Sequence, residues 1–240
     1  MDNKNLSQND QEIILDYSKS VPANFLSNVF SYMAVALLLS GVVAYWWGTS
    51  DLVYSLYTET GLSALGWIVM LSPLAFILLM NFGINKFSQF MLTVFFLAFA
   101  TLMGMSLSSI FLVYSMGSIA ITFGVTAATF GTMAVLGYTT KTDLTKFGSI
   151  LIMGLIGIVI ASLINMFVGS STMDYVISIL GVLIFTGLTA YDVQRLKRIG
   201  AGVEYGTETA GKLAILGATS LYLNFINLFM FLLRIFGSRE

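Results

Sequence analysis

The sequence has 240 residues, a formal net charge of −1, and neither cysteine nor histidine. Hydrophobic residues make up 57% and charged residues 10%, with a mean hydropathy of +0.88. Soluble domains are only about 45–50% apolar and about 25% charged, so we expect an all-α polytopic membrane protein in the lipid bilayer. A chain without a basic surface is not expected to bind nucleic acid. Because histidine is absent, any response to pH near neutrality has to come from a carboxyl group.

Seven apolar stretches follow a polar N-terminal tail of residues 1–23. Each is long enough to cross a hydrocarbon core of about 30 Å at a rise of 1.5 Å per residue. They cover residues 24–46, 61–82, 89–114, 118–138, 148–168, 174–194 and 211–236. Because the connections are short, we expect one seven-helix membrane domain over residues 24–236 and a C-terminal tail over residues 237–240.

Basic residues are distributed unevenly between the two sides of this arrangement. The N-terminal tail and every second connection carry nine of the eleven Lys and Arg residues, and the opposite side carries two. The positive-inside rule therefore predicts a cytoplasmic N-terminus. Seven complete spans would place the C-terminus outside, whereas a last helix that turned back would place all eleven bases inside. The charge count leaves the side of the C-terminus open.

The seventh stretch carries a stripe of small and polar residues. Gly217, Ser220, Asn224 and Asn227 recur at intervals of three and four, which places them on one side of a helix. Amides that faced lipid would lack hydrogen-bond partners, so this side has to face protein or water, and we expect the last helix to be central. The stripe is explained either by hydrogen bonds between helices or by a polar lining of a pore.

The sixth stretch contains the deepest acid of any apolar span. Asp192 lies about one turn before Arg195, Lys197 and Arg198, near the boundary between hydrocarbon and the polar surface layer. An ionisable group near hydrocarbon costs several kcal/mol unless it is paired or hydrated, so Asp192 is a candidate functional residue. The alternative is that Asp192 reaches the headgroups and pairs with Arg195 one turn on. Both interpretations stay open.

Three motifs in order resemble the bacterial branch of the Bax inhibitor-1 family. They are LMGMSLSSIFLVY in the third span, GLTAYDVQRLK in the sixth and LYLNFINLFMFLLRIFG in the seventh. The resemblance covers nearly the whole chain after residue 20. It implies six helices wrapped around the last one, a pH-sensitive calcium leak, and a location in the bacterial inner membrane.

The resemblance also implies roles for particular residues. Asp192 matches one of two aspartates that share a proton in the family, and the second matches Asn224, where an amide replaces the acid. In the family, a basic residue on the second span serves as a latch to this pair, and Lys86, at the cytoplasmic end of that span, is the candidate for it. Arg195, which follows Asp192 by one turn, is the other possible ion-pair partner. Ser220 and Asn227 would extend the polar stripe along the pore.

These residues lead to a functional hypothesis. The ionised Asp192 holds a cationic latch closed, and protonation releases it. With Asn224 as a neutral neighbour the switch is expected to involve a single site and to act at lower pH than a pair of acids would. Calcium prefers hard oxygen ligands, so Asp192 is a possible calcium contact, and binding is expected to be weaker than between two carboxylates. No other cofactor is expected.

Other classes of function are less compatible with the sequence. The lack of histidine, cysteine, a phosphate-binding loop and a second intramembrane acid argues against an enzyme. The serious alternative is a non-conducting regulator that binds another membrane protein complex, such as a quality-control protease. Asp192 distinguishes the two, because a leak needs this residue to be ionisable and reached by water, whereas a regulator would tolerate asparagine there.

Overall fold

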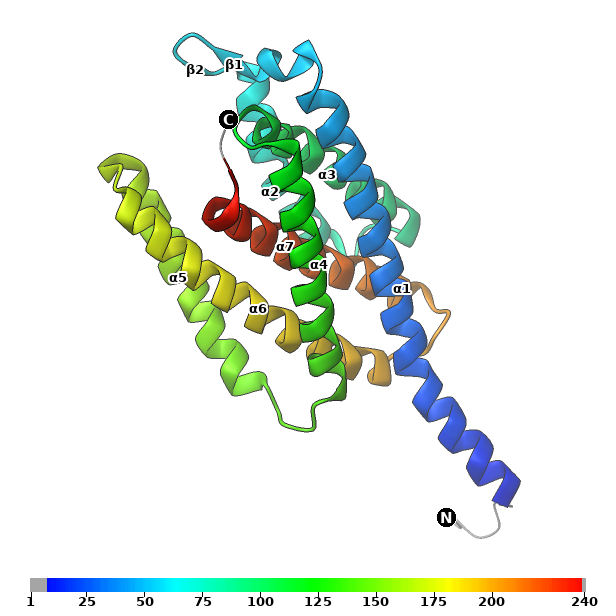
Figure 1. The fold of residues 1–240 in the computed structure, drawn as a ribbon. Coiled ribbons are helices and arrows are strands. Elements are labelled where there is room, and N and C mark those ends of the chain that lie inside the picture. Colours follow the sequence, from blue (N-terminus) through cyan, green and yellow to red (C-terminus); the bar gives the residue numbers. More distant parts are fainter. Residues whose placement is uncertain (1–7, 239–240) are drawn as a thin grey trace.

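The computed structural model describes residues 8–238, so the expected tail residues 1–7 and 239–240 lie outside the described part of the chain. Its seven long helices are α1 (Gln8–Gly48), α2 (Ala64–Gly83), α3 (Gln89–Leu107), α4 (Met116–Thr139), α5 (Thr145–Val168), α6 (Ser171–Gly202) and α7 (Glu208–Phe236) (Figure 1). Within the described residues all seven have the length and composition to cross a membrane, which confirms the predicted fold class. Helix α1 begins at Gln8, so part of the expected polar tail is helical, while its candidate span begins at Ala23.

Short elements connect some of the helices. The α1–α2 connection contains a 3₁₀ helix (Asp51–Leu56) and a small antiparallel hairpin of β1 (Tyr57–Thr58) and β2 (Gly61–Leu62). A second 3₁₀ helix (Ser108–Leu112) follows α3. Side-chain caps fix where most helices start, because the hydroxyl oxygen accepts a hydrogen bond from a free backbone N–H in the first turn. These caps are Ser63, Ser88, Ser115, Ser170 and Thr207.

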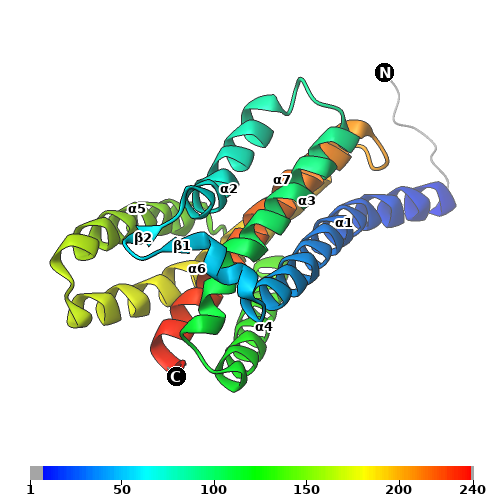
Figure 2. The same ribbon diagram turned by 90° about the horizontal axis from the view of Figure 1, so that it is seen from above.

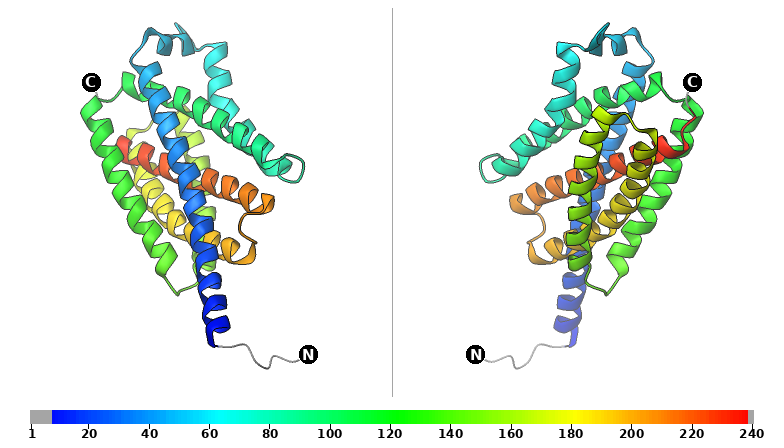
Figure 3. Two further views of the ribbon diagram at one scale, coloured as in Figure 1. Left: turned by 90° about the vertical axis from the view of Figure 1, so that its right-hand side faces the viewer. Right: turned by 90° about the vertical axis from the view of Figure 1, so that its left-hand side faces the viewer.

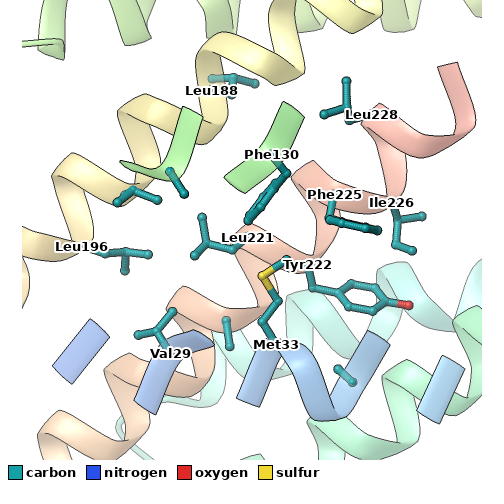
Figure 4. Close-up of a cluster of buried hydrophobic side chains, with 14 of the residues drawn as sticks. Val29, Met33, Phe130, Leu188, Leu196, Leu221, Tyr222, Phe225, Ile226 and Leu228 are labelled. Carbon is teal, nitrogen blue, oxygen red and sulfur yellow. The ribbon is translucent and has the colours of Figure 1, made fainter. Parts of the chain in front are cut away.

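Helix α7 lies at the centre of the bundle, as expected. It packs against α1, α3, α4 and α6, and Figures 2 and 3 show it enclosed by these helices. Leu221 and Tyr222 of α7 are fully buried. In Figure 4, Val29 and Met33 from α1 and Phe130 from α4 surround them. Helix α5 packs mainly on α6 and therefore lies at the edge of the bundle (Figure 1).

Glycines set the close approach of two helix pairs. A Cβ atom on Gly137 of α4 would lie 2.2 Å from the carbonyl oxygen of Ala190 in α6, and one on Gly104 of α3 would lie 2.6 Å from the carbonyl oxygen of Ser40 in α1. Only a residue without a side chain allows the backbones to come this close. The first of these contacts fixes α6 against α4 two residues before Asp192.

The described part of the chain begins and ends on opposite sides of the bundle. Figure 1 shows α1 beginning at the bottom, on the same side as the α4–α5 connection, and the start of α4 and the hairpin at the top. Two hydrogen bonds tie the residues after α7 to the start of α4: Ser115 N–H donates to the carbonyl of Ser238 (3.2 Å), and Ser238 N–H donates to Oγ of Ser118 (3.0 Å). Helix α7 therefore crosses the whole bundle and does not turn back. Below, the side where α1 begins is called the first side.

Candidate functional site

The site is built where α6 crosses α7. Asp192 of α6 and Asn224 of α7 are both buried, with exposed fractions of 8% and 6%. Nδ2 of Asn224 donates a hydrogen bond to Oδ2 of Asp192 at 2.8 Å. The other carboxylate oxygen, Oδ1, lies 3.6 Å from a guanidinium nitrogen of Arg195, one turn further along α6. The carboxylate thus has a neutral partner on one oxygen and a cationic partner on the other.

This carboxylate lies on the wall of a cavity of about 660 Å³ between α5, α6 and α7, which we call the central cavity. Its polar lining consists of Asp192, Arg195, Ser162, Ser220, Asn224 and Asn227, and the rest of its wall is apolar apart from Tyr191. The structure therefore brings together five residues that the sequence singled out: the predicted acid, the amide beside it, one of the two predicted cations, and Ser220 and Asn227 of the predicted stripe.

The two amides of the stripe make different hydrogen bonds. Asn224 bonds across to α6, as described above, whereas Nδ2 of Asn227 donates to the carbonyl of Leu223 in its own helix at 2.8 Å. The stripe was explained either by hydrogen bonds between helices or by a polar lining of a pore, and Asn224 does make a hydrogen bond between helices. Asn227 instead satisfies its donor locally and takes part in the lining of the central cavity.

Lys86, the other candidate latch, lies elsewhere. It belongs to the connection between α2 and α3, where its backbone N–H donates to the carbonyl of Gly83 at 2.8 Å. It is not among the residues that line the central cavity. The cation beside Asp192 is Arg195, whose side chain is 52% exposed. An exposed guanidinium at 3.6 Å is held loosely, so it can leave the carboxylate without unpacking the helices.

A second set of polar contacts, which the sequence did not reveal, fixes the same end of α6. Gln194 is buried; its Oε1 accepts from the N–H of Leu144 (2.9 Å), and its Nε2 donates to the carbonyl of Thr142 (2.8 Å). Arg198 pairs with Asp143 at 2.6 Å. The only sequence signal was polar side chains following an apolar run. These contacts clamp the α4–α5 connection onto α6 and hold the turn that carries Asp192.

Asp143 in this clamp has a perturbed acidity. Hydrogen bonds from the hydroxyl and the backbone N–H of Thr145, followed by the bond from Arg198, lower the pKa of Asp143 to about 2. The group lies in the connection between two spans and is exposed. It is therefore ionised throughout the physiological range and acts as a fixed negative charge opposite Arg198.

A smaller hollow of about 280 Å³ lies on the first side, lined by Thr145, Tyr191, Arg195, Arg198 and Ile199. Tyr191 and Arg195 line both this hollow and the central cavity. These two side chains therefore stand between the cavity and the first side. A change in the position of Arg195 would alter the connection between the two spaces.

The chemistry available at the site is limited. Among the residues that the structure describes, no group of three or more His, Cys, Asp or Glu side chains could hold a metal ion. Calcium usually takes six to eight oxygen ligands. One carboxylate, amide oxygens and hydroxyls suit brief contact with a hydrated cation better than tight binding. The carboxyl group of Asp192 can also accept a proton.

Seven helices that are long and apolar enough to cross a membrane, with a buried carboxylate–amide pair between α6 and the central α7, define an integral membrane protein. The family model described as "Inhibitor of apoptosis-promoting Bax1" matches residues 22–240. The chain therefore belongs to the Bax inhibitor-1 family, as the three sequence motifs indicated.

Several bacterial relatives match over most of their length. A protein from Borreliella burgdorferi is 45% identical over 235 residues, 98% of both chains. Inner membrane protein YbhL of Escherichia coli is 44% identical over 217 residues, 90% of this chain and 92% of YbhL. A protein from Caulobacter vibrioides is 38% identical over 244 aligned positions, 93% of this chain and 97% of its own.

Proposed function

We propose that this protein is a pH-sensitive leak for cations, calcium among them, and that protonation of Asp192 gates it. The observation that carries the proposal is the position of the Asp192 carboxylate. It is buried between Asn224 and Arg195 on the wall of a cavity at membrane depth. Intramembrane acids in such surroundings commonly belong to ion or proton pathways. By analogy with YbhL, we place the protein in a bacterial inner membrane, with the first side in the cytoplasm.

The proposed gate is the contact between Asp192 and Arg195. The ionised carboxylate attracts the guanidinium, which keeps Arg195 between the central cavity and the first-side hollow. A proton on Asp192 removes this attraction. Arg195, already half in contact with solvent, then moves toward the aqueous surface and opens the connection. The leak is accordingly open at low pH and closed at high pH.

The neutral amide of Asn224 makes this a switch with a single acid. Among the described residues that line the central cavity, Asp192 is the one carboxylate. A lone acid titrates independently, whereas two acids in contact titrate as a coupled unit. The opening therefore follows a one-proton curve, and the site binds calcium weakly, since one carboxylate supplies at most two of the oxygens that calcium needs.

Calcium entry into liposomes that contain the purified protein, measured from pH 5 to 8, tests the proposal. Arg195→Gln removes the latch and is expected to raise the flux at pH 8 toward the value of the wild type at pH 5. Lys197→Gln is the matched control, because Lys197 donates to the carbonyl of Tyr138 at 2.7 Å and does not line the cavity. This control is expected to behave like the wild type.

A folded wild-type protein that gives no flux above empty liposomes would refute the leak. That result would favour the second candidate, a non-conducting regulator of another membrane complex such as a quality-control protease. Monodisperse elution and helical circular dichroism establish that each variant is folded before the fluxes are compared.

A further inference from the structure

The central cavity opens through the side of the bundle at membrane depth. Its α5 wall includes Ile152, Val159, Leu163 and Met166, and these apolar side chains are between 42% and 70% exposed. They belong to a membrane-spanning helix that packs mainly on α6. An apolar wall exposed at this depth faces the lipid acyl chains. The cavity is therefore a groove that lipid can enter directly from the bilayer.

The groove is long enough for an extended acyl chain. From Ile152 to Met166 its wall covers fifteen residues of α5, a rise of roughly 20 Å at 1.5 Å per residue. One leaflet contributes about half of a hydrocarbon core of ~30 Å, so a chain that follows the whole wall from the first side passes the midplane of the bilayer. The volume of about 660 Å³ is large, and most of the side chains around it are aliphatic or aromatic. A hydrocarbon chain is the occupant that such a wall favours.

The end of the groove on the first side carries two arginines, each of which faces a carboxylate: Arg195 faces Asp192, and Arg198 faces Asp143. The first-side hollow adjoins the groove through Tyr191 and Arg195 and adds Arg198 and the hydroxyl of Thr145. The side chain of Arg195 is 52% exposed, and one guanidinium can serve an anion while it also faces Asp192.

We propose that this groove binds an anionic phospholipid of the leaflet on the first side. One acyl chain lies along the α5 wall, and the phosphate binds at Arg195 with support from Arg198. Phosphate accepts hydrogen bonds from arginine in a fixed geometry, whereas a choline headgroup brings a cation that would oppose the two arginines. The ligand is therefore a phospholipid with a net negative headgroup.

If the protein conducts cations, as proposed above, the bound lipid blocks conduction. An acyl chain and a hydrated cation exclude each other from the central cavity. The phosphate also holds Arg195 at the mouth, beside Asp192. The protein with lipid bound is therefore the closed form.

Native mass spectrometry of the full chain tests the binding without any measurement of flux. Phosphatidylglycerol, or phosphatidylcholine with the same acyl chains, is added to the protein in detergent. The detergent is then removed in the mass spectrometer, and the fraction of protein that retains one lipid is recorded. Wild type is expected to retain phosphatidylglycerol about fivefold more than phosphatidylcholine, the ratio typical of one basic residue at a membrane surface. Arg195→Gln is expected to abolish this preference, and Lys197→Gln to keep it.

A matched pair of substitutions on α5 tests the groove itself. Val159 lines the cavity and Ile156 does not, although both side chains are at least half exposed and so tolerate a larger residue. Val159→Trp is expected to lower the fraction of protein that retains either lipid, because the indole occupies the space of the acyl chain. Ile156→Trp is expected to leave retention unchanged.

Three results would overturn the proposal: equal retention of the two lipids by the wild type, equal retention by Val159→Trp and Ile156→Trp, or displacement of the lipid by millimolar inorganic phosphate. The last would mean that the site takes the phosphate group without a chain. If lipid binding behaves as expected but the liposomes show no flux, the lipid-binding proposal is supported and the leak proposal is refuted. If flux is present but lipid does not bind as expected, the leak proposal is supported and the lipid-binding proposal is refuted.

Discussion

Replacing Asn224 with aspartate should restore a pair of acids at the site and change the pH response in a defined way. In the wild type the amide nitrogen of Asn224 lies 2.8 Å from Oδ2 of Asp192. After Asn224→Asp, a carboxyl oxygen takes the place of that nitrogen at hydrogen-bond distance. Two charged carboxylates in this arrangement repel each other, so the pair keeps one proton between them over a range of pH in which a lone acid would be ionised.

The size of the effect follows from Coulomb's law. Two unit charges about 4 Å apart interact by about 4 kcal/mol at an effective dielectric constant of 20. At 1.36 kcal/mol for each pH unit, this repulsion corresponds to about three pH units. Relaxation of the side chains and the nearby guanidinium of Arg195 reduce the effect, so three units is an upper bound. The midpoint of the pH-dependent calcium flux is therefore expected to rise by one to about three pH units.

The assay is the flux into liposomes, scanned from pH 5 to 8, with Asn227→Asp as the control. Asn227 lines the same cavity one turn further along α7, but its side chain bonds to the carbonyl of Leu223 and not to Asp192. An acid at position 227 adds the same charge to the cavity but does not contact Asp192, so the midpoint of the flux in this variant should move less. An unchanged midpoint in Asn224→Asp, or an equal shift in both variants, would refute the reasoning.

Two further predictions concern stability. Gly137→Ala is expected to destabilise the protein by roughly 1–3 kcal/mol, because its Cβ would meet the backbone of Ala190. Gly131→Ala in the same helix, with open space at its Cβ, should be neutral or stabilising in thermal unfolding. Asp143 has a pKa lowered to about 2, chiefly by Thr145, so it contributes stability above its unfolded pKa of ~3.9 and loses it as the pH falls through 2. The difference in Tm between wild type and Asp143→Asn should therefore be constant from pH 8 to 5 and shrink only below about pH 4; a difference that grows in acid would contradict this account.

The sequence predicted the seven spans and the central last helix because both leave a direct signal in hydropathy and periodicity. The stripe that includes Asn224 and Asn227 identified the face of α7 that looks into protein, and the motif around Asp192 identified its neighbour. Periodicity places a residue on a face, but it does not determine which hydrogen bond the side chain makes. For this reason the local bond of Asn227 to Leu223 could not be predicted.

Contacts between segments far apart in the chain could not be predicted from the sequence. The choice between Lys86 and Arg195 as the partner of Asp192 depended on where the α2–α3 connection lies, and no pattern along the chain reports that. The clamp of Gln194 on the α4–α5 connection joins residues about fifty positions apart. The position of α5 at the edge of the bundle leaves the groove open to lipid. Among the candidate spans of the described residues α5 has the highest mean hydropathy, which fits a helix that faces lipid but does not identify the helix on which it packs.

The most direct test of the proton switch is the pH profile of calcium flux in Asp192→Asn, measured beside the wild type in the same liposomes. Asparagine keeps the size of the side chain and removes its charge, so it mimics the protonated state at every pH. We expect a flux that is independent of pH between 5 and 8 and close to the value of the wild type at its acidic limit. A folded Asp192→Asn protein that keeps the pH dependence of the wild type would show that another group senses the proton.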